Sequence, residues 1–167
     1  AQYVGMGREL AQEFPSVREI FNRADEALGV KLSSLCFNGE QADLDRTEIT
    51  QPAILTTSIA VWEVLKEAGI AAEMAAGLSL GEYSALVAAG AIDFESAVRL
   101  VARRARIMQK AAPEGQGLMA AVLGLGQELV EDACNQAGSI GVVGIANYNC
   151  PGQMVISGEK TAVLKAG

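Results

Sequence analysis

Residues 77–81 read Gly-Leu-Ser-Leu-Gly and form a Gly-x-Ser-x-Gly motif. The motif follows a short apolar run and opens an Ala/Leu-rich stretch, as in a nucleophile elbow, the tight turn that lifts a serine hydroxyl out of the packed interior. Ser79 would lie at a helix N-terminus, where free backbone N–H groups and the helix dipole stabilise negative charge. The N–H of Leu80 is placed to donate to an oxyanion. The motif therefore favours acyl transfer through a serine ester, and the alternative is that Ser79 only caps the helix.

A second candidate is an arginine on the apolar side of a helix. Residues 94–112 have the pattern of an amphipathic helix, and a rotation of about 100° per residue places Arg104 among its apolar side chains. A guanidinium keeps its proton in proteins, so on a buried face it needs an anionic partner. The spacing leaves two partners open, an Asp or Glu in an internal salt bridge or the carboxylate of a ligand.

The string around Ser79 extends well beyond five residues. Residues 76–86 read Ala-Gly-Leu-Ser-Leu-Gly-Glu-Tyr-Ser-Ala-Leu, and Gly-Ala follows at 90–91. This string resembles the malonyl-CoA:acyl carrier protein transacylases of fatty acid synthesis. Residues 50–53, 98–108 and 147–153 resemble the same family in the same order, so the resemblance covers essentially the whole chain.

The resemblance implies a role for each matching residue. Ser79 would be the acylated nucleophile, and Arg104 matches the arginine with which the family binds malonyl groups. A free malonyl carboxylate would pair bidentately with this guanidinium, whereas an acetyl group would leave its charge unpaired. Leu78 departs from the commoner family pattern, which has a histidine beside the nucleophile, and thereby removes a polar group there.

Three further polar residues match the family. Gln51 matches a glutamine near the active site, and its alternative is a first-turn helix position after a Thr50 cap. Asn147 and Asn149 resemble asparagines that face the active-site cleft. An asparagine before Cys-Pro-Gly is also ordinary turn chemistry, so both interpretations stay open.

The chain contains no histidine. A serine hydroxyl is a poor nucleophile until a base accepts its proton, and acyl-transfer enzymes usually use imidazole for this step. The resemblance implies a catalytic histidine beyond residue 167 and a second oxyanion donor, from a Gly-Gln-Gly turn, before residue 1. We therefore expect a fragment, about half of the parent protein, that is inactive by itself.

Composition narrows the class of protein. The net charge of −7 argues against a nucleic-acid partner, because phosphate binding needs a basic field. No apolar run approaches the ~20 residues that span a bilayer, so no membrane partner is expected. The three cysteines are scattered and the sequence shows no secretory signal, so we expect reduced thiols in the cytoplasm. Without histidine or a Cys-x-x-Cys pair, a metal site is not expected; the resemblance implies no redox cofactor, with the coenzyme A thioester as substrate.

The chemistry-bearing residues need a scaffold, and hydrophobic spacing predicts it. The elements predicted before residue 113 are a helix over 17–28 capped by Ser16 and stopped by Gly29, a polar loop over 38–47, a helix over 51–68 with Pro52 in its first turn, a strand over 73–77, a helix over 80–89, and the helix over 94–112 capped by Asp93. Strands over 118–123, 140–147 and 153–157 and helices over 127–137 and from 159 are predicted after residue 117.

Residues 113–117 read Pro-Glu-Gly-Gln-Gly and predict a boundary. Residues 1–114 are expected to form a partial α/β-hydrolase-like acyltransferase subdomain of the α/β class. Residues 115–167 have the order β-α-β-β-α, which predicts an inserted, partial ferredoxin-like subdomain without its last strand.

The function predicted in this way is malonyl transfer from coenzyme A to the pantetheine thiol of acyl carrier protein, by a ping-pong mechanism. One alternative is an acyltransferase domain of a polyketide or multifunctional synthase, and another is an inert fragment of the enzyme. A serine esterase is the third alternative, and the buried position of Arg104 argues against it because a neutral ester has no need of a cation. A basic stripe formed by Arg99, Arg103, Arg106 and Lys110 is expected to be a solvated helix face, the alternative being contact with coenzyme A phosphates or the carrier protein.

Overall fold

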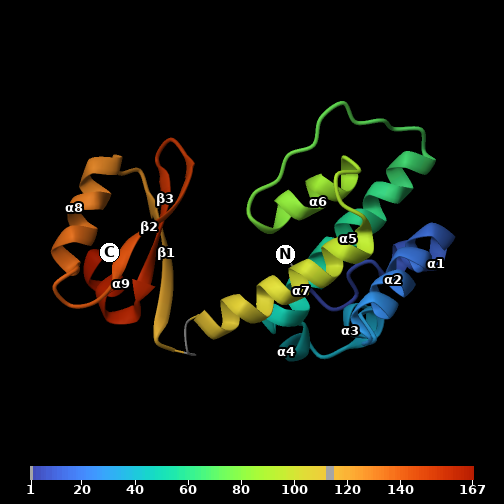
Figure 1. The fold of residues 1–167 in the computed structure, drawn as a ribbon, viewed down its shortest axis with the longest axis horizontal. Helices are drawn as coiled ribbons and strands as arrows, with labels where there is room; N and C mark the ends of the chain where they lie inside the picture. The colour runs from blue at the N-terminus through green and yellow to red at the C-terminus, as the bar shows by residue number, and fades with distance from the viewer. Residues whose placement is uncertain (1, 112–114) are drawn as a thin grey trace. The chain divides into compact units, whose positions relative to one another are not determined.

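The computed structural model describes residues 2–111 and 115–167 and contains two compact units, Ala1–Gln109 and Lys110–Gly167. The boundary predicted after residue 114 falls at residues 112–114, outside the described residues. The helices of the first unit are α1 (Arg8–Glu13), α2 (Pro15–Leu28), α3 (Leu32–Asn38), α4 (Gln41–Leu44), α5 (Thr47–Glu67), α6 (Leu80–Ala88) and α7 (Phe94–Ala111), and the last two residues of α7 belong to the second unit (Figure 1).

The core of the first unit forms between α2, α5 and α7. On α2 the apolar side chains recur every three or four residues and are buried, namely Val17, Ile20, Phe21 and Ala24. Gly29 ends this helix with φ 67°, as expected of a glycine C-cap. The predicted Ser16 cap is wrong, because Pro15 occupies the first helical position, for which its fixed φ and missing N–H suit it.

Helix α5 begins at Thr47, four residues before the predicted start. The N–H groups of Ile49 and Thr50 both donate to the carbonyl of Arg46, so the turn before Pro52 is already helical. Pro52 therefore lies inside the helix and Thr50 is not its cap. The Thr50 hydroxyl instead donates to the carbonyl of Leu44, 2.5 Å away, at the end of α4. Helix α4 lies in the segment predicted as a loop.

Residues 73–77, predicted as a strand, form no strand; they belong to the extended segment, residues 71–77, which runs between α5 and α6 without helix or strand (Figure 1). The backbone of residues 71–77 makes no hydrogen bond with the rest of the described chain. A strand exists only through pairing with a neighbour, and the sheet that the described residues contain belongs to the second unit. The segment is exposed along its length and leads directly into α6.

The second unit consists of a three-stranded sheet and two helices. Its elements are β1 (Gly117–Leu123), α8 (Gln127–Ala137), β2 (Val143–Cys150), β3 (Gln153–Glu159) and α9 (Lys160–Ala166). The strand order is β1-β3-β2 with both pairs antiparallel, and α8 and α9 lie on the same face of the sheet (Figure 1). Met154 and Ile156 of β3 and Val130 of α8 form the core between the sheet and the helices. The α/β content predicted for the chain is thus present, although β2 starts three residues later than expected.

No helix in the part of the chain that the structure describes combines the length and the apolar character needed to cross a bilayer.

The turn between the extended segment and α6 is sharp, and one of its glycines is sterically required. A Cβ on Gly77 would lie 2.0 Å from the carbonyl carbon of Gly81 and 2.4 Å from the backbone nitrogen of Glu82. A Cβ on Gly81 would meet no atom within 4 Å. The two glycines of the motif therefore differ, and only Gly77 permits the close approach of the two backbones.

This difference generates a prediction. Gly77→Ala should destabilise the turn by a few kcal/mol, because the backbone must move to admit the methyl group. Gly81→Ala, its matched control, should be neutral or stabilising by up to ~1 kcal/mol, because alanine favours the helix. Urea unfolding of the two variants measures both effects, and equal destabilisation would contradict the close approach.

Candidate active site

Ser79 precedes α6 in a strained backbone conformation. Its φ is 53° and its ψ is −105°, and it is the one non-glycine residue with positive φ within residues 2–111 and 115–167. A non-glycine residue held in such a sparsely populated region costs about 1–3 kcal/mol and persists only where the surrounding structure imposes it. The side chain is exposed at this bend. The predicted sharp turn with an accessible hydroxyl is therefore present.

The first turn of α6 holds this bend in place. The backbone N–H of Ser79 donates to the Glu82 carboxylate, 3.1 Å from Oε1, so Glu82 acts as a capping carboxylate at the helix start. The N–H of Leu80, the first helical residue, donates to no acceptor in the described residues. A free donor thus lies directly after the serine, at the positive end of the helix dipole.

Arg104 of α7 reaches the serine. Its Nη2 donates to Ser79 Oγ at 2.9 Å, and its Nη1 donates to Gln51 Oε1 at 2.5 Å. The side chain is half-buried, and no carboxylate oxygen of the described residues lies within 4.0 Å of the guanidinium. The internal salt bridge left open by the sequence is therefore not formed there. The cation has two neutral hydrogen-bond partners and an uncompensated charge.

Gln51 connects α5 to this cluster. It is 7% exposed, lies in the second turn of α5 rather than the first, and accepts from Arg104. Its Nε2 is 3.5 Å from the Met108 sulfur, which makes a weak acceptor. Sequence reasoning missed Met108, although its position one turn after Arg104 places the two side chains on the same face of α7.

Tyr83 is the second residue that sequence reasoning missed. The Arg104 Cζ atom lies 5.7 Å from the centroid of the Tyr83 ring, within the range of a cation–π contact. Tyr83 follows Ser79 by four residues, one turn along α6, and this spacing was the available signal. The first unit thus brings together Ser79, Arg104, Gln51 and Tyr83 from three helices.

Asn147 and Asn149 belong to the second unit, on β2. Asn147 is half-buried and pairs in register with Val155 of β3. The Asn149 side-chain amide donates to Gln153 Oε1, 3.3 Å away across the β2–β3 hairpin. Asn149 therefore has the local partner expected of a turn residue, and its side-chain oxygen accepts no hydrogen bond from the described residues.

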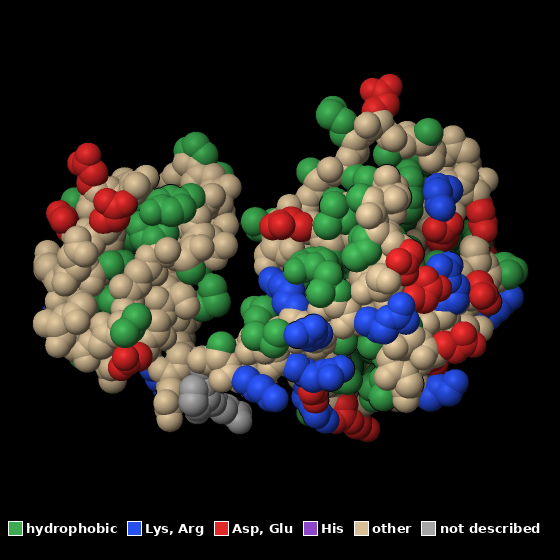
Figure 2. Space-filling view, viewed as in Figure 1, with side chains coloured by type: hydrophobic (Ala, Val, Ile, Leu, Met, Phe, Trp, Pro, Cys, Tyr) green, Lys and Arg blue, Asp and Glu red, His purple; other side chains and the backbone are tan. Residues whose placement is uncertain are grey.

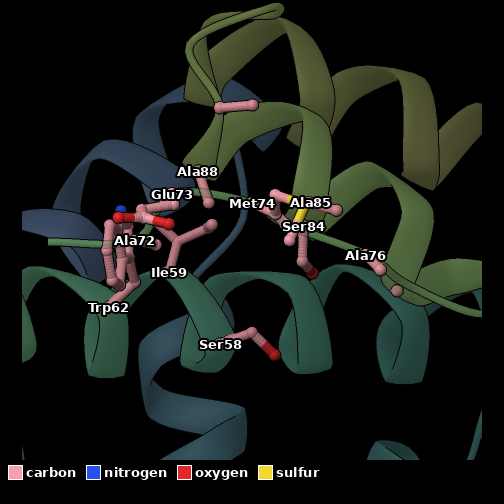
Figure 3. Close-up of a pocket in the computed structure, with 13 residues that line it drawn as sticks. Ser58, Ile59, Trp62, Ala72, Glu73, Met74, Ala76, Ser84, Ala85 and Ala88 are labelled. Atoms are coloured by element: carbon pink, nitrogen blue, oxygen red, sulfur yellow. The ribbon is translucent and has the colours of Figure 1, made fainter.

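A hollow of about 690 Å³ lies between α5, the extended segment and α6. Figure 3 shows Ile59 and Trp62 of α5 and Ala85 and Ala88 of α6 around it, with Met74 of the extended segment. Its lining is mostly apolar and includes neither Ser79 nor Arg104. The hollow is therefore separate from the polar cluster.

The outer face of α7 carries exposed cations. Figure 2 shows Lys and Arg side chains gathered along this helix, where Arg99, Arg103 and Arg106 are exposed. None of the three is within 4.0 Å of a carboxylate of the described residues. The exposure predicted from the spacing is therefore present. The described residues also contain no group of three or more His, Cys, Asp and Glu side chains arranged to hold a metal ion.

Comparison with known proteins identifies the family to which this chain is similar. The family model described as "Acyl transferase domain" matches residues 1–166. The malonyl CoA-acyl carrier protein transacylase of Bacillus subtilis strain 168 is 49% identical over 164 residues, which are 98% of this chain and 52% of that protein. The chain spans about half the length of the curated relatives it matches.

Solved structures agree with this match. The malonyl CoA-acyl carrier protein transacylase of Clostridium perfringens superposes with a TM-score of 0.93 and 49% identity, over 99% of this chain and 52% of that one. A malonyl-transacylase solved in complex with a type II PKS acyl-carrier protein superposes with a TM-score of 0.91 and 46% identity, over 99% and 54% of the two chains. The family model covers almost every residue, and Arg104 lies beside the elbow serine as a cation with no carboxylate partner among the described residues. This chain belongs to the acyl transferase domain family.

Proposed function

We propose that this chain carries the nucleophile and the carboxylate-binding arginine of an enzyme that transfers malonyl groups from coenzyme A to acyl carrier protein. The observation that carries the proposal is the contact between Ser79 Oγ and Arg104, whose charge no described carboxylate neutralises. A cation beside an exposed nucleophile suits an acyl group with a free carboxylate. The relatives that share nearly half of the residues are named for this transfer.

In the first half-reaction Ser79 Oγ attacks the thioester carbonyl carbon. A carbon–oxygen bond forms as the carbon–sulfur bond breaks, and coenzyme A leaves as its thiol. The Leu80 N–H donates to the oxyanion of the tetrahedral intermediate. The serine proton must pass to a base, and Glu82 is committed to the Ser79 backbone N–H. Because the 167 residues include no histidine, we expect the base to lie outside them.

In the second half-reaction the pantetheine thiol of the carrier protein attacks the malonyl ester on Ser79. The carbon–oxygen bond breaks, the serine recovers its proton and the malonyl thioester of the carrier leaves, which completes a ping-pong cycle. Arg104 can hold the free carboxylate through both steps. In a malonyl ester the carboxylate carbon is two carbons from the bond to Oγ, and the guanidinium already lies 2.9 Å from Oγ.

Gln51 is the partner that holds Arg104 from the side of α5, and we include it in the substrate-binding set. We also propose substrate contacts for Asn147 and Asn149, on the strength of the family resemblance and of the Asn149 side-chain oxygen, which accepts no hydrogen bond from the described residues. No metal or redox cofactor takes part in the proposed chemistry, and the coenzyme A thioester is the substrate.

A polyketide pathway is the second candidate setting. It is supported by the related malonyl-transacylase that was solved with a type II PKS acyl-carrier protein. The residues around Ser79 would act identically on either carrier. Transfer rates to fatty-acid and polyketide carrier proteins, measured side by side, separate the two settings. A serine esterase remains disfavoured, since a neutral ester leaves the charge of Arg104 without a partner.

The finer fold assignment also belongs to this proposal. For the second unit, the antiparallel order β1-β3-β2 with both helices on one face supports a ferredoxin-like subdomain, spanning 115–167 and lacking its last strand. For residues 1–114, the strained serine at the start of α6 supports an α/β-hydrolase-like core.

A cytoplasmic location is supported by the free thiols Cys36, Cys134 and Cys150. Burial raises the pKa of Cys36 to about 12, so this thiol is inert at neutral pH.

Arg104→Ala tests the proposed function. In the full-length protein encoded by the reading frame that contains this chain, the variant should lower kcat/KM for malonyl-CoA by about 30- to 1,000-fold, the cost of removing one partner of a charge pair. The acetyl-CoA value should change by less than about threefold, because acetyl never engages the cation.

Arg103→Ala is the matched control, because Arg103 is the neighbouring arginine on the solvated face of α7. Steady-state transfer to carrier protein, measured with each donor, provides both constants. An equal loss for the two donors would show that Arg104 does not bind the malonyl carboxylate.

A second prediction concerns the chain by itself. The purified 167-residue polypeptide should show no malonyl transfer above the rate of its Ser79→Ala variant, because it lacks a base to activate the serine. A radiolabelled transfer assay measures this directly. Sustained turnover by the unaltered polypeptide that Ser79→Ala abolishes would contradict the requirement for an external base.

A further inference from the structure

Three described side chains restrain the Arg104 guanidinium in different ways. Gln51 and Ser79 each accept an N–H, at 2.5 and 2.9 Å. Tyr83 offers only the face of its ring, 5.7 Å from Cζ. A guanidinium has five N–H donors, and a bidentate carboxylate needs two of them in parallel. Tyr83 is thus the one of these three groups that restrains the cation without using a donor that the ligand requires.

The ring is itself held firmly. Tyr83 is half-buried and packs against the core of the first unit, as do Leu80 and Val87 of the same helix. The face of its ring is what it presents to Arg104. Because α6 starts directly after Ser79, one short helix sets the position of the nucleophile and of the surface on which the cation lies.

We propose that Tyr83 is a positioning residue that orients the Arg104 guanidinium toward the incoming carboxylate and thereby sets the preference for malonyl over acetyl donors. The proposal rests on the proposed function. When a carboxylate arrives, the guanidinium must turn two parallel N–H groups toward it, and a ring face allows the cation to move in its own plane while it does so. A hydrogen-bonding group in the place of Tyr83 would compete with the ligand for the same donors.

Tyr83→Leu removes the ring and keeps an apolar side chain on α6. In the full-length protein, the ratio of kcat/KM for malonyl-CoA to that for acetyl-CoA should fall roughly three- to thirtyfold, the range expected from the loss of one cation–π contact. The loss should appear mainly in KM for malonyl-CoA. Tyr83→Phe keeps the ring face and should restore the ratio to within about twofold of the unaltered protein. Leu86→Ala, an exposed position on the same helix, is the control for changes in α6.

A purely structural role gives a different result. If Tyr83→Leu lowers kcat/KM for both donors equally, the ring only supports the fold and the proposal is wrong. If Tyr83→Phe is impaired as much as Tyr83→Leu, the hydroxyl acts and the ring-face argument is wrong. Tyr83→Met replaces Tyr83→Leu if the latter does not fold, with the same expected fall in the ratio.

The test also separates this inference from the proposed function. If Arg104→Ala removes the malonyl preference while Tyr83→Leu and Tyr83→Met leave it intact, only the positioning role is overturned. If Arg104→Ala leaves the preference unchanged, the function proposed for Arg104 fails, and the role of Tyr83 fails with it.

Discussion

The hydrogen bond between Arg104 and Ser79 is the interaction on which the site depends. It joins the middle of α7 to the start of α6, and Gln51 extends it to α5. A half-buried guanidinium with only neutral partners retains an unmet demand for an anion, because neutral hydrogen bonds do not cancel its charge. The chemistry proposed for this chain follows because this cation lies 2.9 Å from the Ser79 hydroxyl.

The strained turn at Ser79 is encoded locally. The segment before it pairs with no strand in the described residues, yet Ser79 keeps its φ of 53°. Three short-range features impose this conformation: the close approach permitted by Gly77, the Glu82 carboxylate on the Ser79 N–H, and the helix that starts at Leu80. Each of these features lies within residues 77–82, next to the nucleophile itself.

Local patterns in the sequence predicted the parts of the site that depend on local structure. The glycine spacing placed Ser79 at a bend, and helical periodicity placed Arg104 on the inner face of α7. The strand expected over 73–77 failed because a strand depends on a distant partner. The start of α5 was misplaced because Pro52 favours a first turn, whereas hydrogen bonds to Arg46 begin the helix earlier. Tyr83 and Met108 were missed because each contacts a residue of another helix, and spacing within one helix shows only which residues share a face.

The central claim is that Ser79 accepts the acyl group and that the adjacent cation selects acyl groups with a free carboxylate. The most direct measurement is a competition in which the full-length protein is mixed with equal concentrations of malonyl-CoA and acetyl-CoA, quenched in acid and mapped by mass spectrometry. The account predicts an ester on the peptide that contains Ser79, predominantly malonyl. An ester on another residue, or equal amounts of malonyl and acetyl on Ser79, would contradict it.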